Sequence, residues 1–130
     1  MKVNTNNKVL WYTKDREWIP VCDKIYEKYG HLSFSACLNN MAFVVLSLIH
    51  GQLDYSKTIT TAVMCGTDTD CTGGTAGSIV GAAIGYQGLD PKWILPLNDR
   101  VKTIVADFGE GRITDLVQRT IVASQLTTNP

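Results

Sequence analysis

The chain has 130 residues, with 12 basic and 12 acidic side chains and therefore a formal net charge of zero. This balance argues against a nucleic-acid partner, because phosphate binding usually requires an excess of Lys and Arg. No apolar run reaches the roughly 18 residues of a membrane span, so no membrane partner is expected. The length predicts one domain, residues 1–130, large enough to fold without a disulfide or a metal.

The cysteines indicate a reducing compartment. Four occur, and none belongs to a Cys-x-x-Cys pair: Cys22, Cys37, Cys65 and Cys71. The polar N-terminal residues do not resemble a secretory signal. We therefore expect reduced, mostly buried thiols in a cytoplasmic protein.

The chain begins with residues 1–17, which lack hydrophobic periodicity and predict a loose segment before a helical core over 18–126. Pro20 suits the first turn of a helix, and Gly30 suits its end. An apolar stripe recurs between them at helical spacing. These signals together predict a helix over about 20–29.

A second helix is predicted over about 35–50, and it is apolar nearly all round. Such a helix is typical of a central, buried position. Asn39 and Asn40 lie near its start, and buried amides need hydrogen-bond partners. They could bond to neighbouring backbone or support a site. His31 leaves a similar choice between a capping side chain and a site residue.

Two further helices flank a short acidic turn that contains Asp68 and Asp70. Asp54 can cap the first of them, over about 55–65, which Gly66 closes. The second follows the turn, over about 70–86, and its glycines recur every four residues: Gly73, Gly77, Gly81 and Gly85. Because a helix-interior glycine costs about 0.8–1 kcal/mol against alanine, we expect this helix to pack closely between at least two others.

The C-terminal part is less regular. Asp90-Pro91 predicts the start of a short helix. Residues 101–108 fit either a short helix or an extended segment, and Gly109 and Gly111 are expected to break the chain. Apolar residues at three-four spacing predict a last helix over about 112–125. The predicted fold class is all-α, a compact helical bundle.

The acidic turn brings two like charges within a few ångströms of each other. Their repulsion costs about 1 kcal/mol in water and several times more near a protein surface. A helix N-terminus can offset it, so one aspartate could be only a cap. A divalent cation could offset it better, Mg²⁺ first and then Mn²⁺ or Ca²⁺, with further oxygens from Thr69 and Thr72. Spacing alone leaves both explanations open.

The stretch Gly66-Thr67-Asp68-Thr69-Asp70-Cys71, followed by the glycine-rich helix, resembles the last acidic motif of the ADP-ribosylglycohydrolase family. Shorter stretches resemble the C-terminal third of the same family: His31, the Asn39-Asn40 pair with Ala42, Pro91-x-Trp93, Leu97-Asn98-Asp99-Arg100 and Phe108-Gly109-Glu110. Together these stretches cover about residues 25–125.

The resemblance implies a partial ADP-ribosylglycohydrolase-type fold that binds ADP-ribose and hydrolyses its glycosidic bond to a protein side chain or a small acceptor. It makes Asp68 and Asp70 ligands of Mg²⁺ and places Cys71 where the family often has a hydroxyl ligand. The implied ADP-ribose-binding residues are Gly66, Thr67, Thr69, Thr72 and Gly73, supported by His31, Asn39 and Asn40. N–H groups at the start of the glycine-rich helix could also face a phosphate.

One motif of the family is missing. Its first acidic motif, a Thr or Ser before two adjacent aspartates, lies near the N-terminus of a longer chain, and this sequence contains no Asp-Asp pair. We therefore expect an incomplete site with weak activity, in the C-terminal piece of a larger enzyme or in a truncated relative. The alternative is a non-catalytic domain that binds ADP-ribose, forms a homodimer or associates with a missing N-terminal segment.

A third hypothesis is phosphoryl transfer of the haloacid dehalogenase type, which also uses Asp-x-Asp. That chemistry would need a hydrophobic strand directly before Asp68 and alternating strands and helices. The pattern around Asp68 is helical instead, which favours the glycohydrolase hypothesis.

Overall fold

The computed structural model describes residues 17–128, with side chains described as far as residue 125. Within this range most residues are helical, and the all-α prediction is confirmed, with one small hairpin in addition. Contacts divide the chain into two compact units that join between Gly88 and Leu89. The single domain over 1–130 stays a prediction, and the predicted loose segment falls almost wholly outside the described residues.

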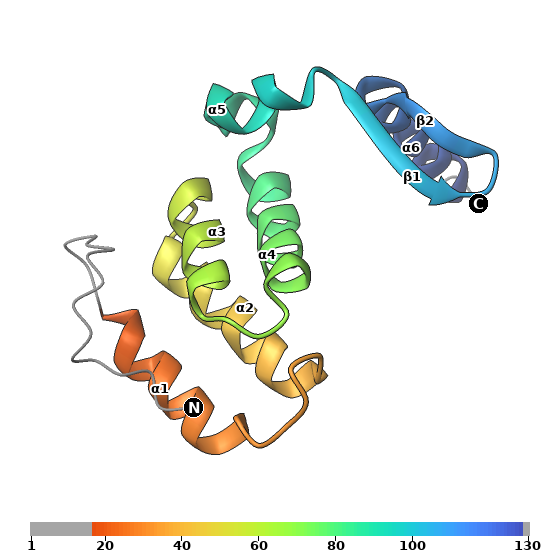
Figure 1. The fold of residues 1–130 in the computed structure, drawn as a ribbon. Coiled ribbons are helices and arrows are strands. Elements are labelled where there is room, and N and C mark those ends of the chain that lie inside the picture. Colours follow the sequence, from red (N-terminus) through yellow and green to blue (C-terminus); the bar gives the residue numbers. More distant parts are fainter. Residues whose placement is uncertain (1–16, 129–130) are drawn as a thin grey trace. The chain divides into compact units, whose positions relative to one another are not determined.

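In its described residues, 17–88, the first unit contains four helices: α1 (Trp18–Tyr29), α2 (Cys37–Gly51), α3 (Tyr55–Met64) and α4 (Thr69–Ile84), followed by the 3₁₀ turn η1 (Tyr86–Gly88). Their bounds lie close to the predicted ones. The first helix packs on α2, while α4 packs on both α3 and α2 (Figure 1). Among residues 17–128 no helix is long and apolar enough to cross a membrane.

Two buried clusters hold this unit together. One joins α1 to α2 and to the end of α3, and its buried members are Trp18, Cys22, Phe43, Leu46 and Cys65. The other joins α2, α3 and α4, and its buried members are Val44, Ala62 and Ala76. The end of α3 therefore belongs to the core, and the acidic turn begins directly after it.

The second helix, α2, is buried on one face only. Phe43 and Val44 lie in the two core clusters, whereas an apolar row on α2 stays 47% to 69% exposed: Leu38, Met41, Val45 and Ile49. The predicted central position of α2 is confirmed, since α1, α3 and α4 all pack on it. Its predicted burial is wrong at this row, which those three helices leave exposed.

The glycine spacing of α4 matches its contact with α3. A Cβ at Gly73 would lie 3.1 Å from Val63 Cγ2, and a Cβ at Gly77 would lie 3.2 Å from Ile59 Cδ1. Both distances are tighter than ordinary contact, so the missing side chains allow the two backbones to approach. Gly85 has a different role, because it ends the helix with a left-handed φ of 69°. The predicted close packing is confirmed against α3, and α4 also packs on α2.

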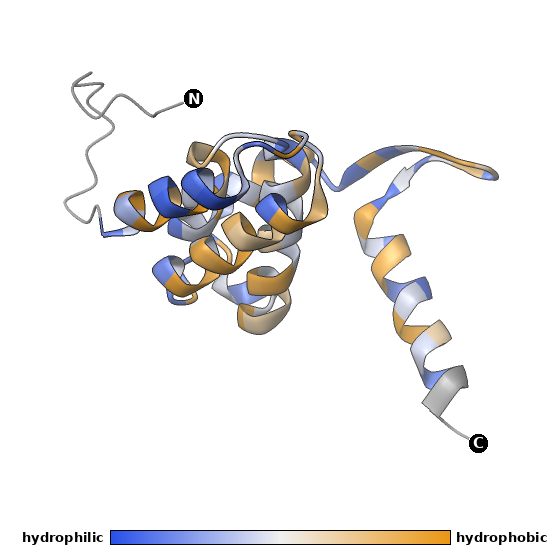
Figure 2. Ribbon diagram, turned by 90° about the horizontal axis from the view of Figure 1, so that it is seen from below, coloured by the Kyte–Doolittle hydropathy of each residue, from blue (hydrophilic) through white to orange (hydrophobic). Residues whose placement is uncertain are grey.

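The second unit contains α5 (Pro91–Ile94), the 3₁₀ turn η2 (Leu95–Leu97), the strands β1 (Arg100–Val105) and β2 (Phe108–Arg112), and α6 (Ile113–Thr128). The strands are antiparallel, with Arg100 opposite Arg112 and Val105 opposite Phe108. Hydrophobic residues recur along α6, the helix that ends near the C-terminus (Figure 2).

Residues 101–108, which fit either a short helix or an extended segment by sequence, lie in the hairpin, so the extended alternative is correct. Its β-branched Val, Thr and Ile residues fit a pleated strand. The expected chain breaks at Gly109 and Gly111 were wrong, because both residues lie inside β2. Gly111 instead provides space for an aromatic ring, since a Cβ there would lie 2.8 Å from Phe108 Cζ.

Candidate metal centre

The acidic turn connects α3 to α4 through an unusual backbone. Gly66 and Thr67 are both left-handed, with φ of 82° and 64°. Glycine tolerates this conformation, whereas a β-branched residue such as threonine rarely adopts it. Strain of this kind persists only where neighbouring groups fix it, and it is concentrated at functional sites.

Residues from α1 and α2 fix the turn. Thr67 Oγ1 donates to Asn40 Oδ1 at 2.7 Å, and Tyr26 Oη donates to the carbonyl oxygen of Cys65. The tyrosine also restricts the next position, because a Cβ at Gly66 would lie 2.8 Å from Tyr26 Oη. Hydrogen bonds to α1 and α2 therefore hold the turn in place without a ligand. Tyr26 gave no signal in the sequence beyond its place beside an apolar stripe, so its role at the turn was not predicted.

The sequence left open whether Asn39 and Asn40 bond to neighbouring backbone or support a site, and in the structure they do both. Asn39 is buried; its Nδ2 donates to Ser33 O at 3.1 Å and its Oδ1 accepts from the Asn40 amide at 2.9 Å. Asn40 Nδ2 donates to Phe34 O at 2.9 Å, while its Oδ1 accepts from Thr67. Asn39 thus organises the loop before α2, and Asn40 links that loop to the acidic turn.

Three potential metal ligands meet at the start of α4. Carboxylate oxygens of Asp68 and Asp70 and the sulfur of Cys71 all lie within 4.8 Å of one another. Asp68 occupies the N-cap position, yet its carboxylate makes no capping hydrogen bond. Within the described part of the chain this is the one such group of three His, Cys, Asp or Glu residues. His31, exposed in the turn after α1, is outside it.

The donor set fits a hard divalent cation. Two carboxylates at short range suit Mg²⁺ or Mn²⁺. A hydrogen bond with Asp68, together with the negative charge of that carboxylate, raises the pKa of the Cys71 thiol. A protonated thiol is a poor metal ligand. Asp68 and Asp70 are therefore the ligands that fit, with Cys71 beside them.

The predicted ADP-ribose-binding residues divide into two groups. Gly66, Thr67 and Thr69 are partly exposed at the turn and the first turn of α4. Thr72 is 1% exposed, and its Oγ1 lies 3.4 Å from Thr69 O. Gly73 packs under α3. These last two residues face the protein interior.

A shallow hollow of about 260 Å³ lies elsewhere in the first unit. Trp18 and Val21 of α1 and Leu46 and Ile49 of α2 form part of its wall, and no residue of the acidic turn lines it. The candidate metal centre is therefore an exposed turn, and the hollow is a separate feature.

A model of the ADP-ribosylglycohydrolase family matches residues 5–128, nearly the whole chain. No curated protein and no solved structure matches. The family acts on ADP-ribosylated substrates and generally depends on a divalent metal, so the match supports a glycohydrolase-like function. The segment before Asp68 is the helix α3, which excludes the strand that the haloacid dehalogenase hypothesis required.

Proposed function

We propose that this chain, which belongs to the ADP-ribosylglycohydrolase family, binds a divalent cation through Asp68 and Asp70 and holds ADP-ribose beside it. One observation carries the proposal: the donor atoms of the cluster lie within 4.8 Å of one another, while the Asp68 carboxylate makes no capping bond that a ligand would have to break. Mg²⁺ is the first candidate and Mn²⁺ the second.

The chain's own residues would prepare this site. Thr67 and Asn40 keep the turn in its left-handed conformation, so the two carboxylates are presented before the cation arrives. A bound divalent cation would supply Lewis-acid stabilisation of charge on the ribose and lower the pKa of a coordinated water. Such preorganisation reduces the entropy that binding would otherwise cost.

ADP-ribose would lie along the exposed side of the turn. Gly66, Thr67 and Thr69 are accessible there, and the N-terminus of α4 favours a phosphate through its dipole. Thr72 and Gly73 would act from inside, by seating α4 against α3. Asn39 and Asn40 would support the turn through the loop before α2, and His31, exposed near that loop, would approach only a ligand extending beyond the turn.

The activity of this chain would be weak. Hydrolysis in the family also uses its first acidic motif, with two adjacent aspartates, and no Asp-Asp pair occurs in these 130 residues. Two carboxylates can hold a cation, but they leave no further acidic group at the turn to activate a water. Cleavage of an ADP-ribosylated protein at an ordinary enzymatic rate would contradict this part of the proposal.

Calorimetric titration tests the site directly. Mg²⁺ and Mn²⁺, each with and without ADP-ribose, are titrated into the native chain and into Asp68→Asn/Asp70→Asn. We expect binding to the native chain and loss of binding in the variant, because the amides keep the shape of the turn and remove its charge.

The matched control is Asp54→Asn/Asp90→Asn. It removes the same charge from two other helix starts, and asparagine caps a helix about as well as aspartate. Unchanged binding in this control assigns the cation to the acidic turn. Equal binding in all three proteins, or binding in none, would refute the metal site.

A second function, self-assembly, is favoured by the exposed apolar row on α2. Leu38, Met41, Val45 and Ile49 recur at helical spacing, and a row of this kind commonly marks an interface. Sedimentation of the native chain and of Met41→Glu/Val45→Glu tests it. A dimer that the charged variant abolishes supports a homodimer, and a native monomer at all concentrations excludes it.

A further inference from the structure

The hollow beside α1 and α2 has no part in the candidate metal centre, yet it carries exposed apolar surface. Trp18 and Leu46 are 7% and 8% exposed and form its floor. Val21 and Ile49 stand at its edge and stay 45% and 69% exposed. Covering these two aliphatic side chains would remove further apolar surface from water and stabilise the first unit.

The size and lining of the hollow restrict what can fill it. Its volume is about 260 Å³, below the roughly 300–1,000 Å³ of most small-molecule sites. The remaining lining is polar and includes Glu17, His50 and Lys57, and the His50 ring centre lies 6.4 Å from that of Trp18. An apolar floor with a polar rim suits an aromatic side chain that has a polar tip, such as tryptophan.

The chain carries such a side chain directly before the hollow. Val9-Leu10-Trp11-Tyr12 is the one run of consecutive apolar residues in the sequence before Trp18. The polar stretch Thr13-Lys14-Asp15-Arg16 separates this run from Glu17, the first described residue, which itself lines the hollow. We propose that Leu10 and Trp11 bind in the hollow of their own molecule, with the Trp11 indole on the Trp18–Leu46 floor.

The connection to Glu17 is long enough for this. Trp11 precedes Glu17 by six residues, and an extended chain spans at most about 3.3–3.6 Å per residue, so Trp11 can reach about 20 Å from Glu17. A β-turn reverses the chain within four residues, the number that residues 13–16 would supply. A segment tethered this closely acts at a millimolar effective concentration. The chain's own segment is thereby favoured over a second copy, which would have to bind from dilute solution.

Binding of the segment would also change the exposed face of α2. Ile49 belongs both to the hollow and to the exposed apolar row of α2. The segment would cover Ile49 and leave Leu38, Met41 and Val45 exposed, so self-assembly through α2 would be limited to these three residues. No residue of the acidic turn lines the hollow, so the proposal does not depend on a cation there.

Nuclear magnetic resonance of the full chain tests the proposal. We expect nuclear Overhauser contacts from the indole protons of Trp11 to the methyl groups of Val21 and Ile49. A mixture of labelled and unlabelled chains shows whether these contacts form within one molecule. Leu10→Ala/Trp11→Ala should lower the melting temperature by roughly 5 °C, because the apolar edge of the hollow is then uncovered.

Two charged variants locate the binding surface. Val21→Glu/Ile49→Glu places charges at the edge of the hollow and should abolish the Trp11 contacts. The matched control, Leu38→Glu/Val45→Glu, charges the exposed row of α2 outside the hollow and should keep them. All four replaced side chains are 45% to 69% exposed, so both variants should retain the native helix content by circular dichroism.

Three results would overturn the proposal. One is a Trp11 indole in the native chain with random-coil shifts and no contact to the hollow. Another is an unchanged melting temperature in Leu10→Ala/Trp11→Ala, or equal Trp11 contacts in both charged variants. Contacts that form only between labelled and unlabelled molecules would assign the hollow to a second copy instead of the chain's own segment.

Discussion

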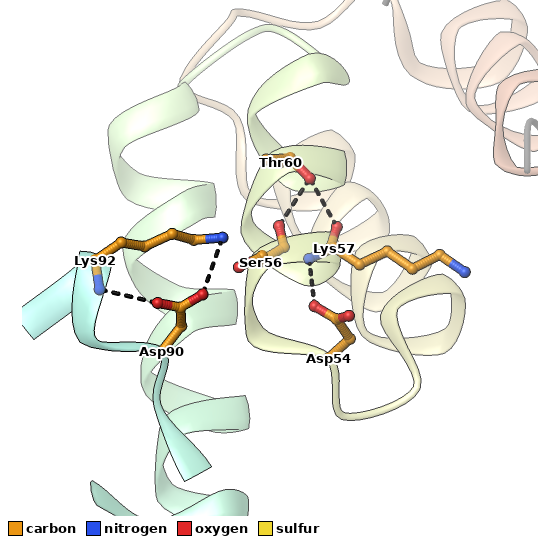
Figure 3. Close-up of polar contacts among 6 residues, drawn as sticks. All are labelled: Asp54, Ser56, Lys57, Thr60, Asp90 and Lys92. Carbon is orange, nitrogen blue, oxygen red and sulfur yellow. Dashed lines mark hydrogen bonds and ion pairs between the residues drawn. The ribbon is translucent and has the colours of Figure 1, made fainter. Parts of the chain in front are cut away.

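The helices α3 and α4 both begin at an aspartate, and the two carboxylates act differently. Asp54 Oδ1 accepts a hydrogen bond from the Lys57 amide at 2.8 Å, the usual N-cap arrangement (Figure 3). Asp68 occupies the same position at α4, and its side chain makes no such bond. The Asp68 carboxylate accepts no backbone N–H of its helix and has only the Cys71 thiol beside it, so it is available to a ligand. This difference separates a structural aspartate from a candidate functional one.

The helices of the second unit follow the first pattern. Asp90 Oδ1 accepts from the Lys92 amide at 2.9 Å at the start of α5 (Figure 3). Asp99, from the loop before β1, accepts from the Thr114 amide at 2.9 Å at the start of α6. The starts of α3, α5 and α6 are thus capped by an aspartate side chain. The start of α4, at Asp68, is not.

The largest expected effect concerns how tightly the start of α3 is packed. A Cβ at Gly51 would lie 1.9 Å from Thr58 Oγ1 and 2.9 Å from the Thr58 Cα, so the α3 backbone would have to move. Gly51→Ala should therefore destabilise the fold by about 2 kcal/mol, as overpacked cores do. Chemical denaturation measures the change.

The matched control for that substitution lies on α4. A Cβ at Gly74 meets no heavy atom within 4 Å. Gly74→Ala should therefore stabilise the protein by about 0.5–1 kcal/mol, through helix propensity alone. Equal effects of the two substitutions would contradict the contrast between a packed α3 start and an open side of α4.

The second prediction compares the two N-cap aspartates themselves. Asp54→Ala should lower the free energy of unfolding by about 1 kcal/mol, because the Lys57 amide loses its partner. Asp68→Ala should change it by less than about 0.5 kcal/mol, because no capping bond is lost, the thiol of Cys71 is only a weak donor, and the repulsion from Asp70 is relieved. Urea denaturation without divalent cations measures both values. A loss at Asp68 as large as that at Asp54 would show that Asp68 is structural.

The sequence predicted where the helices begin and end, but not that the carboxylates of Asp54 and Asp68 would act differently. Asp54, Pro20 and Gly66 are local signals, and local signals place helix ends because capping and left-handed turns depend on a few adjacent residues. Whether the Asp68 carboxylate caps α4 depends on side-chain rotation that no spacing pattern encodes. The link from Asn40 to Thr67 joins residues far apart in the chain, so the sequence could only leave it open.

Two errors have a similar origin. The all-round apolar pattern of α2 predicted burial, but burial depends on what covers the helix, and the row from Leu38 to Ile49 is uncovered in the described structure. Gly109 and Gly111 predicted chain breaks, although both lie inside β2, where Gly111 pairs with Val101 of β1. In both cases the tertiary neighbours, absent from a local pattern, decided the outcome.

The smallest expected effect tests whether Asp99 is a capping aspartate, in contrast to Asp68. The amide of Thr114, followed by the side chains of Arg112 and Thr114, lowers the pKa of the Asp99 carboxyl below its ordinary value. A lowered pKa in the folded state contributes stability that is complete above the unfolded pKa of about 3.9 and is lost as the pH falls through the folded value. Circular dichroism between pH 6 and pH 2 should therefore show that the native chain loses helix in acid more steeply than Asp99→Asn, in which the side chain is uncharged throughout.

The control Asp107→Asn removes one charge from the left-handed hairpin turn, a conformation that asparagine also adopts, and should follow the native curve. Identical acid transitions for the native chain and Asp99→Asn would mean that the capping bond at α6 does not depend on the charge of Asp99, and the contrast with Asp68 would then rest on hydrogen bonding alone.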